Sequence, residues 1–162
     1  MIDIPQIEFP DFIGVLPEEP TSPGGDPGTI KPVEAQHVAL LYEAAFDRRP
    51  DISGLNYWID QFEGGMSLFE IAIRFIASDE FKDLYKDPAK LSNGAFVDIL
   101  YLNVLDRPGE EGGFNYWLGQ LNGGESRQSV LTKFAVSAEN YEGSPYVTSI
   151  ANDGSGHWDF AF

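Results

Sequence analysis

Two aromatic–polar pairs have the residue types and spacing of a ligand-binding surface. Tyr57 precedes Gln61 and Tyr116 precedes Gln120 by one helical turn, so each ring and amide lie near each other on a helix. An aromatic ring can stack on a sugar while an amide hydrogen-bonds its hydroxyls, and ligand sites mix such groups. These four residues are the candidate ligand-binding residues, with polysaccharide as one expected partner.

Carboxylates near predicted turns form a second candidate site, for calcium. Asp47 and Asp51 supply oxygen ligands in the first half of the chain, and Asp106, Glu110 and Glu111 follow in the second. The alternating ligand pattern with a central glycine that calcium loops use is absent. A structural role is the favoured alternative, in which Asp47 and Asp106 cap a turn or pair with the arginines that follow them.

Residues for catalysis are sparse. The two histidines, His37 and His157, lie far apart in the sequence, cysteine is absent, and the glycine cluster around Gly24 lacks the lysine of a phosphate-binding loop. We therefore expect no enzymatic activity and no cofactor, calcium being the one ligand ion considered. A net charge of −16 repels phosphate backbones and anionic lipid, and no apolar run has transmembrane length, so we expect neither nucleic-acid binding nor membrane insertion.

The elements that must position these residues repeat along the chain. Val38, Leu41, Tyr42, Ala45 and Phe46 have the spacing of an amphipathic helix, and Val97, Leu100, Tyr101, Val104 and Leu105 repeat it 59 positions later. Two further helices are expected in each copy, one containing the tryptophan (Trp58 or Trp117) in its apolar stripe and one beginning at Ser67 or Ser126. Core packing is the favoured interpretation of both tryptophans.

This pattern predicts an all-α protein made of two tandem copies of a three- to four-helix unit packed together. The predicted division is a Pro-rich acidic arm at 1–32, repeats at 33–90 and 91–143, and an irregular tail at 144–162. The arm, which we expect to be extended, contains scattered apolar side chains. The candidate partner-binding residues among them are Ile4, Ile7, Phe9 and Phe12. The arm could dock on its own domain or on a partner by strand addition.

The ordered string from Leu41-Tyr42 through Asp47-Arg48, Gly54 and Tyr57-Trp58 to Ser78-x-Glu80-Phe81, repeated in the second copy, resembles the domain-of-unknown-function 4214 family. The sequence departs from the family in two ways. Asp47 and Asp106 stand where the family usually has glycine, and Asn140 replaces the aromatic residue after Glu139. The resemblance implies an all-helical fold, similar in part to phycobilisome linker domains, in bacterial secreted or surface proteins; it implies no catalytic residue.

The C-terminal sequence Asp159-Phe160-Ala161-Phe162 resembles the end of type I secretion substrates, in which an acidic residue precedes terminal hydrophobic ones. Lack of cysteine, high acidity and an N-terminus without signal-peptide features agree with that route. We therefore expect a non-catalytic, secreted or cell-surface protein-interaction or adhesion module, exported by a type I apparatus, with another surface or secreted protein as partner. A carbohydrate-binding module and a cytosolic linker-like scaffold are the alternatives.

Overall fold

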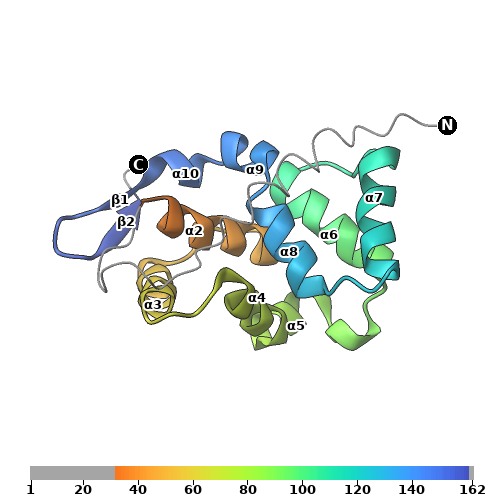
Figure 1. Ribbon diagram of the computed structural model, residues 1–162, viewed down its shortest axis with the longest axis horizontal. Coiled ribbons are helices and arrows are strands. Elements are labelled where there is room, and N and C mark those ends of the chain that lie inside the picture. Colours follow the sequence, from red (N-terminus) through yellow and green to blue (C-terminus); the bar gives the residue numbers. More distant parts are fainter. Residues whose placement is uncertain (1–31, 161–162) are drawn as a thin grey trace.

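The computed structural model describes residues 32–160 and confirms the all-α prediction (Figure 1). The first repeat contains α2 (Pro32–Phe46), α3 (Ile52–Glu63), α4 (Leu68–Ala77), α5 (Asp79–Tyr85) and the 3-10 turn η2 (Pro88–Lys90). The second contains α6 (Asn93–Leu105), α7 (Glu111–Asn122), α8 (Arg127–Ala135) and α9 (Ala138–Gly143). A C-terminal segment follows, made of α10 (Pro145–Ser149), β1 (Ile150–Asn152) and β2 (Trp158–Phe160).

The two repeats use the same boundary chemistry. Helices α3, α4 and α5 begin 59 positions before α7, α8 and α9. Ser67 and Ser126 cap α4 and α8, each accepting a backbone N–H bond within the first turn. The turns before these helices contain Gly65 at φ 102° and Gly124 at φ 108°, a conformation that favours glycine because it has no Cβ.

Helix α2 is the central element of the core. It packs against α3 and α4 of its own repeat, α6 and α8 of the other repeat, and α10. The predicted stripe is buried, but Ala39, Leu40 and Ala44, which lie outside it, are also fully buried. The expectation of a simple amphipathic helix is therefore wrong for α2, whose neighbours enclose it on nearly every side. This packing of one helix against both repeats closes a single core.

Residues 145–160 of the C-terminal tail form a short helix and a hairpin, which corrects the prediction of an irregular segment. Strands β1 and β2 pair antiparallel, with Ile150 opposite Phe160 and Asn152 opposite Trp158. Trp158 and Phe160 are buried while Asp159 is exposed, so the alternation of a half-buried strand is present. The sequence pattern failed because both strands have three residues, too few for a clear period.

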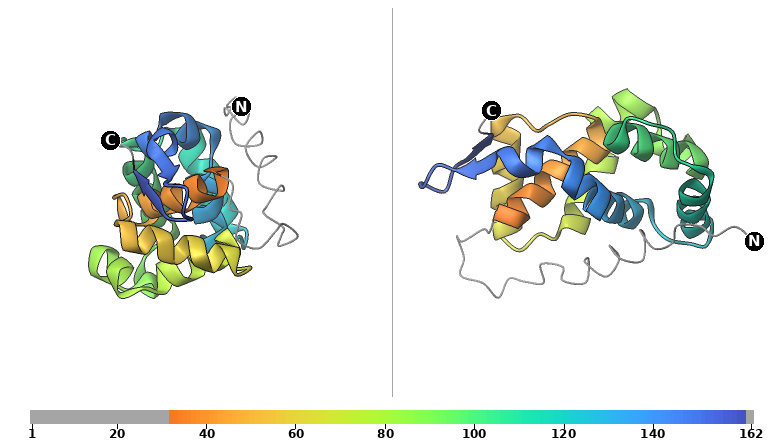
Figure 2. Two further views of the ribbon diagram at one scale, coloured as in Figure 1. Left: turned by 90° about the vertical axis from the view of Figure 1, so that its left-hand side faces the viewer. Right: turned by 90° about the horizontal axis from the view of Figure 1, so that it is seen from above.

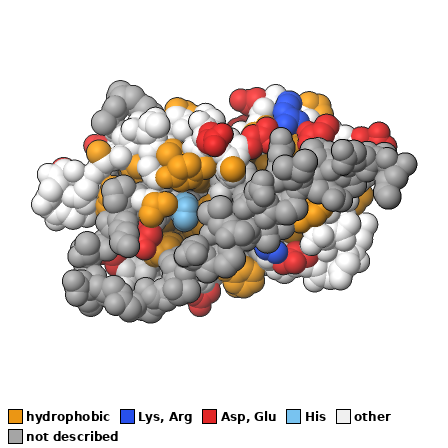
Figure 3. Space-filling model, turned by 45° about the horizontal axis from the view of Figure 1, so that its top comes forward, with side chains coloured by type: hydrophobic (Ala, Val, Ile, Leu, Met, Phe, Trp, Pro, Cys, Tyr) orange, Lys and Arg blue, Asp and Glu red, His pale blue; other side chains and the backbone are white. Residues whose placement is uncertain are grey.

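The molecule is elongated, with the hairpin at one end and α7 at the other (Figure 2). Acidic side chains are spread over the face in Figure 3, and hydrophobic side chains remain exposed between them. The larger exposed apolar residues include Tyr57, Phe69, Ile73 and Leu102. Within residues 32–160, no helix is both long enough and apolar enough to cross a membrane.

Candidate functional site

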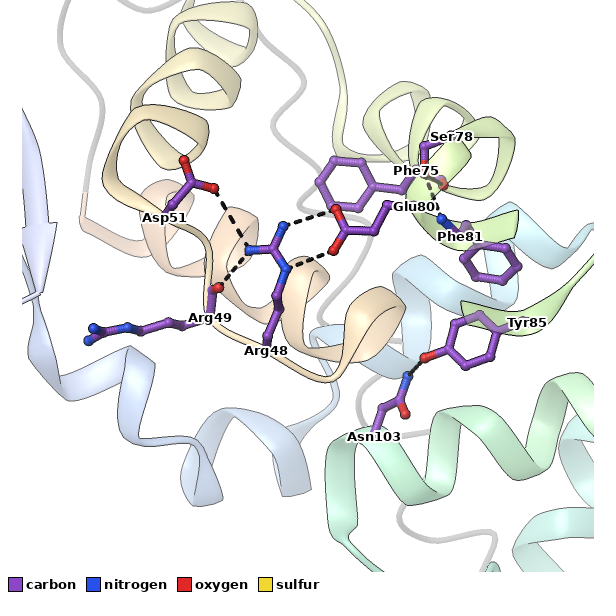
Figure 4. A network of polar contacts seen from close by, with 9 residues as sticks. All are labelled: Arg48, Arg49, Asp51, Phe75, Ser78, Glu80, Phe81, Tyr85 and Asn103. Atoms are coloured by element: carbon purple, nitrogen blue, oxygen red, sulfur yellow. Dashed lines mark hydrogen bonds and ion pairs between the residues drawn. The ribbon is translucent and has the colours of Figure 1, made fainter. Parts of the chain in front are cut away.

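The shared polar residues of the first repeat meet at an arginine–glutamate pair (Figure 4). Arg48 follows α2, and Glu80 lies in the first turn of α5. The guanidinium donates from Nε to Glu80 Oε1 at 2.7 Å and from Nη2 to Oε2 at 2.9 Å, a bidentate geometry that fixes both side chains. The guanidinium carbon also lies 5.2 Å from the centre of the Tyr42 ring. The pair therefore fastens the end of α2 to the start of α5.

The second repeat contains the same connection with one fewer bond. Arg107 donates from Nη2 to Glu139 at 3.0 Å and from Nη1 to Glu110 at 2.6 Å, and it lies 5.7 Å from the Tyr101 ring centre. The arginine and glutamate are 32 residues apart in both repeats. The sequence analysis named Asp47 and Asp106 as possible partners of the arginines and missed these glutamates. The equal sequence separation of arginine and glutamate in the two copies was the feature of the sequence that could have identified these pairs.

Local capping positions Glu80 for this contact. Ser78 Oγ accepts the Phe81 N–H at 3.1 Å and donates to the Phe75 carbonyl at 2.6 Å, which joins α4 to α5 through a sharp bend. Farther along α5, Tyr85 Oη accepts from Asn103 Nδ2 at 2.7 Å, and the same amide donates to the Ala44 carbonyl at 2.9 Å. These bonds tie the shared motif of the first repeat to α6 of the second.

Glycine is required at Gly54 by a close approach. A Cβ there would lie 2.8 Å from Tyr42 Oη, closer than a carbon and an oxygen normally approach. The ring of Tyr42 in turn packs edge-on against Phe75 at 4.8 Å. Tyr101 and Phe134 repeat this ring contact at 5.0 Å in the second copy. The shared tyrosine and phenylalanine are thus core residues.

The two aspartates that replace the usual family glycine end the first helix of each repeat. Asp47 and Asp106 have φ values of 55° and 52°, and their N–H groups donate to Glu43 and Leu102 carbonyls. They are therefore αL caps of the preceding helices, and the ion pairs of Arg48 go to Glu80 and Asp51 instead. Partial burial, and then repulsion by Asp106, raise the pKa of Asp47.

The calcium candidates take part in local structure. Asp51 is the N-cap of α3, and its Oδ2 accepts from Ser53 Oγ at 2.6 Å and from the Gly54 N–H at 3.1 Å. These two bonds lower the pKa of Asp51. In the second repeat Glu110 is paired with Arg107, while Glu111 is exposed. Among residues 32–160, no group of three or more His, Cys, Asp or Glu side chains is arranged to hold a metal ion.

The aromatic–amide pairs are present on two separate helices. Tyr57 is 54% exposed and Gln61 is half-buried on α3, while Tyr116 and Gln120 are both half-buried on α7. Figures 1 and 2 place α3 and α7 in different parts of the elongated molecule, so the four residues do not form one platform. Any ligand contact by these pairs would involve two distinct surfaces.

The neighbouring tryptophans are packing residues, as predicted. Trp117 is only 1% exposed. Trp58 is half-buried and contacts Phe75 edge-on, with ring centres 5.2 Å apart. Trp117 packs on Phe134, the counterpart of Phe75, with ring centres 5.6 Å apart, so each tryptophan contacts the phenylalanine that the repeats share.

The terminal candidates are described only in part. Ile4, Ile7, Phe9 and Phe12 lie outside the described residues, as do Ala161 and Phe162. Asp159 is exposed on β2, whereas Phe160 is 8% exposed with the Arg49 guanidinium 5.7 Å from its ring centre. As far as Phe160, the candidate secretion signal is therefore part of a strand that packs against the fold.

Two ionisable side chains of α2 lie near α9 and the start of α10. Burial raises the pKa of Glu43 to about 7, and the nearby side chains of Ser144 and Asn140 offset that rise only in part. Burial also lowers the pKa of His37 to about 4, and its ring lies edge-on to Tyr141 at 6.5 Å. Asn140, the second departure from the family pattern, is 1% exposed and donates to the Ala135 carbonyl at 2.7 Å, so its amide is satisfied inside the fold.

The fold and these contacts define an all-helical protein with two tandem repeats, in which an arginine–glutamate pair closes each repeat. The chain belongs to the family described as "Domain of unknown function (DUF4214)", whose model matches residues 28–85 and 72–143. The family prediction from sequence is thus confirmed for both copies. No curated protein and no solved structure gives a significant match.

Proposed function

We propose that this protein is a non-catalytic interaction module that acts outside the cell or at its surface after type I export. The observation that carries the proposal is that the arginine and the glutamate shared by the repeats bind each other within the fold. Arg48 binds Glu80, and Arg107 binds Glu139. The shared pattern thus supplies a scaffold, and partner recognition falls to the surfaces that differ between the repeats.

The C-terminal sequence supports the export part of the proposal. Asp159-Phe160-Ala161-Phe162 has the acidic–hydrophobic pattern of type I substrates. In the folded chain Phe160 is buried beside Arg49. Recognition of this ending therefore has to precede docking of the hairpin, which agrees with transport of a chain that is not yet folded.

Secretion from a bacterial host that carries a type I transporter tests the export route. We expect removal of residues 161–162 together with Asp159→Ala to lower the protein in the medium at least tenfold, with an undiminished amount made in the cell. Asn56→Ala is the matched control, because it loosens the hairpin while leaving the last four residues intact. Undiminished export of the truncated chain would contradict the proposed signal.

Cell fractionation tests the location independently. A protein acting on the surface or in the medium is recovered in those fractions when expressed at its natural level. Retention in the cytosol would contradict the extracellular proposal and would favour the linker-like scaffold.

Glycan binding is a second candidate function, favoured by the exposure of Tyr57. Its ring is 54% exposed on α3, and Gln61 lies one turn away. A glycan array should then show binding that Tyr57→Ala lowers at least tenfold. Phe69→Ala, which removes a different exposed ring from α4, should leave the affinity unchanged. An array without binding removes this candidate and leaves the protein-interaction proposal standing.

A further inference from the structure

The C-terminal segment shows how the first repeat binds a short strand. Gln36 on α2 donates to the Val147 carbonyl at 2.6 Å. On α3, the Asn56 amide donates to the Trp158 carbonyl at 2.8 Å and accepts the Trp158 N–H at 2.8 Å. A single side chain thus satisfies both backbone groups on the outer edge of β2, as a neighbouring strand would.

The second repeat has the same asparagine, and no strand within residues 32–160 lies on it. Asn115 precedes Tyr116-Trp117 as Asn56 precedes Tyr57-Trp58, and it is exposed. Leu118, the counterpart of the buried Ile59, is half-buried. The α7 surface that corresponds to the strand-binding surface of α3 is therefore open among the described residues.

Side chains of helix α6 are also more exposed than the side chains at the equivalent positions of α2. Leu40 of α2 is fully buried, but its counterpart Ile99 is half-buried. Glu43, which faces α9 and α10, corresponds to Leu102, which is 50% exposed. We call Ile99, Leu102, Asn115 and Leu118 the repeat-2 seat. Of their counterparts on repeat 1, Asn56 binds the backbone of β2 and Glu43 lies near Ser144 at the start of α10, while Leu40 and Ile59 are buried. Exposed leucine and isoleucine beside an exposed amide suit an extended apolar peptide.

We propose that the repeat-2 seat binds the N-terminal arm of the same chain at Ile7-Glu8-Phe9, whose backbone pairs with the Asn115 amide. This tripeptide has the apolar–acidic–aromatic order of Trp158-Asp159-Phe160. In the bound strand β2 the two apolar residues are buried and the acid is exposed. The same alternation places Ile7 and Phe9 against the seat and Glu8 toward solvent.

The length of the arm permits this contact within one molecule. Residues 10–31 separate Phe9 from the start of α2. Extended, they span up to about 70 Å at ~3.3 Å per residue. A domain of this size has a radius of gyration of about 14 Å. The arm can therefore reach the second repeat from the start of α2. This inference is independent of the export route.

Paramagnetic relaxation on the full chain tests the proposal. Because the sequence has no cysteine, Glu8→Cys provides one site for a nitroxide label. We expect the label to attenuate amide signals near Ile99, Asn115 and Leu118 at least fivefold more than those near Asn56. Adding Asn115→Ala should reduce that attenuation at least threefold with an unchanged melting temperature.

Two variants and one mixture make the test specific. Phe9→Asp should abolish the attenuation, whereas Gln6→Asp, which adds the same charge three residues away, should retain it. Attenuation that is uniform, absent, or centred on α3 or α4 overturns the proposal. A mixture of labelled chains with isotope-enriched, unlabelled chains should show none of the effect, since attenuation there would identify a second copy as the occupant.

Discussion

The bidentate pair between Arg48 and Glu80 differs from its counterpart between Arg107 and Glu139 in a way that stability measurements can resolve. Glu80 uses both oxygens, whereas Glu139 accepts one bond because Arg107 also binds Glu110. These side chains are about 40% exposed, so water screens the charges and the expected energies are small. A difference in stability between the two pairs would therefore reflect hydrogen-bond geometry more than charge.

We expect Glu80→Gln to lower the free energy of unfolding by about 1 kcal/mol and Glu139→Gln by about half as much. Chemical denaturation at neutral pH measures both values. Asp83→Asn is the matched control, because this exposed acid lies on the same helix as Glu80, and it should change stability by less than about 0.5 kcal/mol. Equal losses for the two glutamates would contradict the assigned role of the second hydrogen bond.

Asp47 offers a stabilising substitution. Its φ of 55° costs a non-glycine residue conformational energy, and its carboxylate is repelled by Asp106. Asp47→Gly should raise the free energy of unfolding by about 0.5–1 kcal/mol. Asp47→Asn separates the causes, because it removes the charge and retains the side chain in the αL conformation. A lower melting temperature for Asp47→Gly would show that the aspartate contributes a stabilising contact.

At the scale of elements, Asn56 is the anchor that holds the hairpin to α3. Replacing it by alanine removes two hydrogen bonds from the Trp158 backbone and leaves those groups unsatisfied, a cost of about 2 kcal/mol. Hydrogen exchange should therefore accelerate at least tenfold for residues 150–160. Asn115→Ala, the equivalent change in α7, should leave exchange in the hairpin unchanged. Slow hairpin exchange in Asn56→Ala would mean that the apolar contacts of Trp158 and Phe160 suffice.

The sequence predicted the elements that have a strong period or a local cap. The duplicated helices, the serine cap at Ser67 and the buried Trp117 follow from spacing alone. Two features required the tertiary structure. The burial of α2 on nearly every side depends on helices from both repeats, and the order of the hairpin depends on Asn56, 102 residues before Trp158. Contacts between distant segments leave little trace in one sequence.

At the scale of the whole molecule, stability should depend on pH through two groups of α2 with opposite effects. The pKa of Glu43 is raised from 4.5 to about 7, so the unfolded chain releases this proton first and the free energy of unfolding falls as pH rises from 4.5 to 7. The pKa of His37 is lowered from 6.5 to about 4, so the unfolded chain takes up this proton first and stability falls as pH drops from 6.5 to 4. The two trends oppose each other between pH 4.5 and 6.5.

Single variants should separate these trends. In Glu43→Gln the His37 effect remains, and the free energy of unfolding should increase from pH 4.5 to 6.5. In His37→Gln the Glu43 effect remains, and stability should decrease over that interval by about 1–2 kcal/mol, a value reduced for the partial exposure of the carboxyl. Glu43 is also close to the carboxylates of Asp106 and Asp47 and interacts with Tyr146. Denaturant unfolding at half-unit pH steps measures both slopes. Parallel profiles for the two variants would contradict the assignment, because a pair of groups that both favour their neutral forms must give slopes of opposite sign when each is removed in turn.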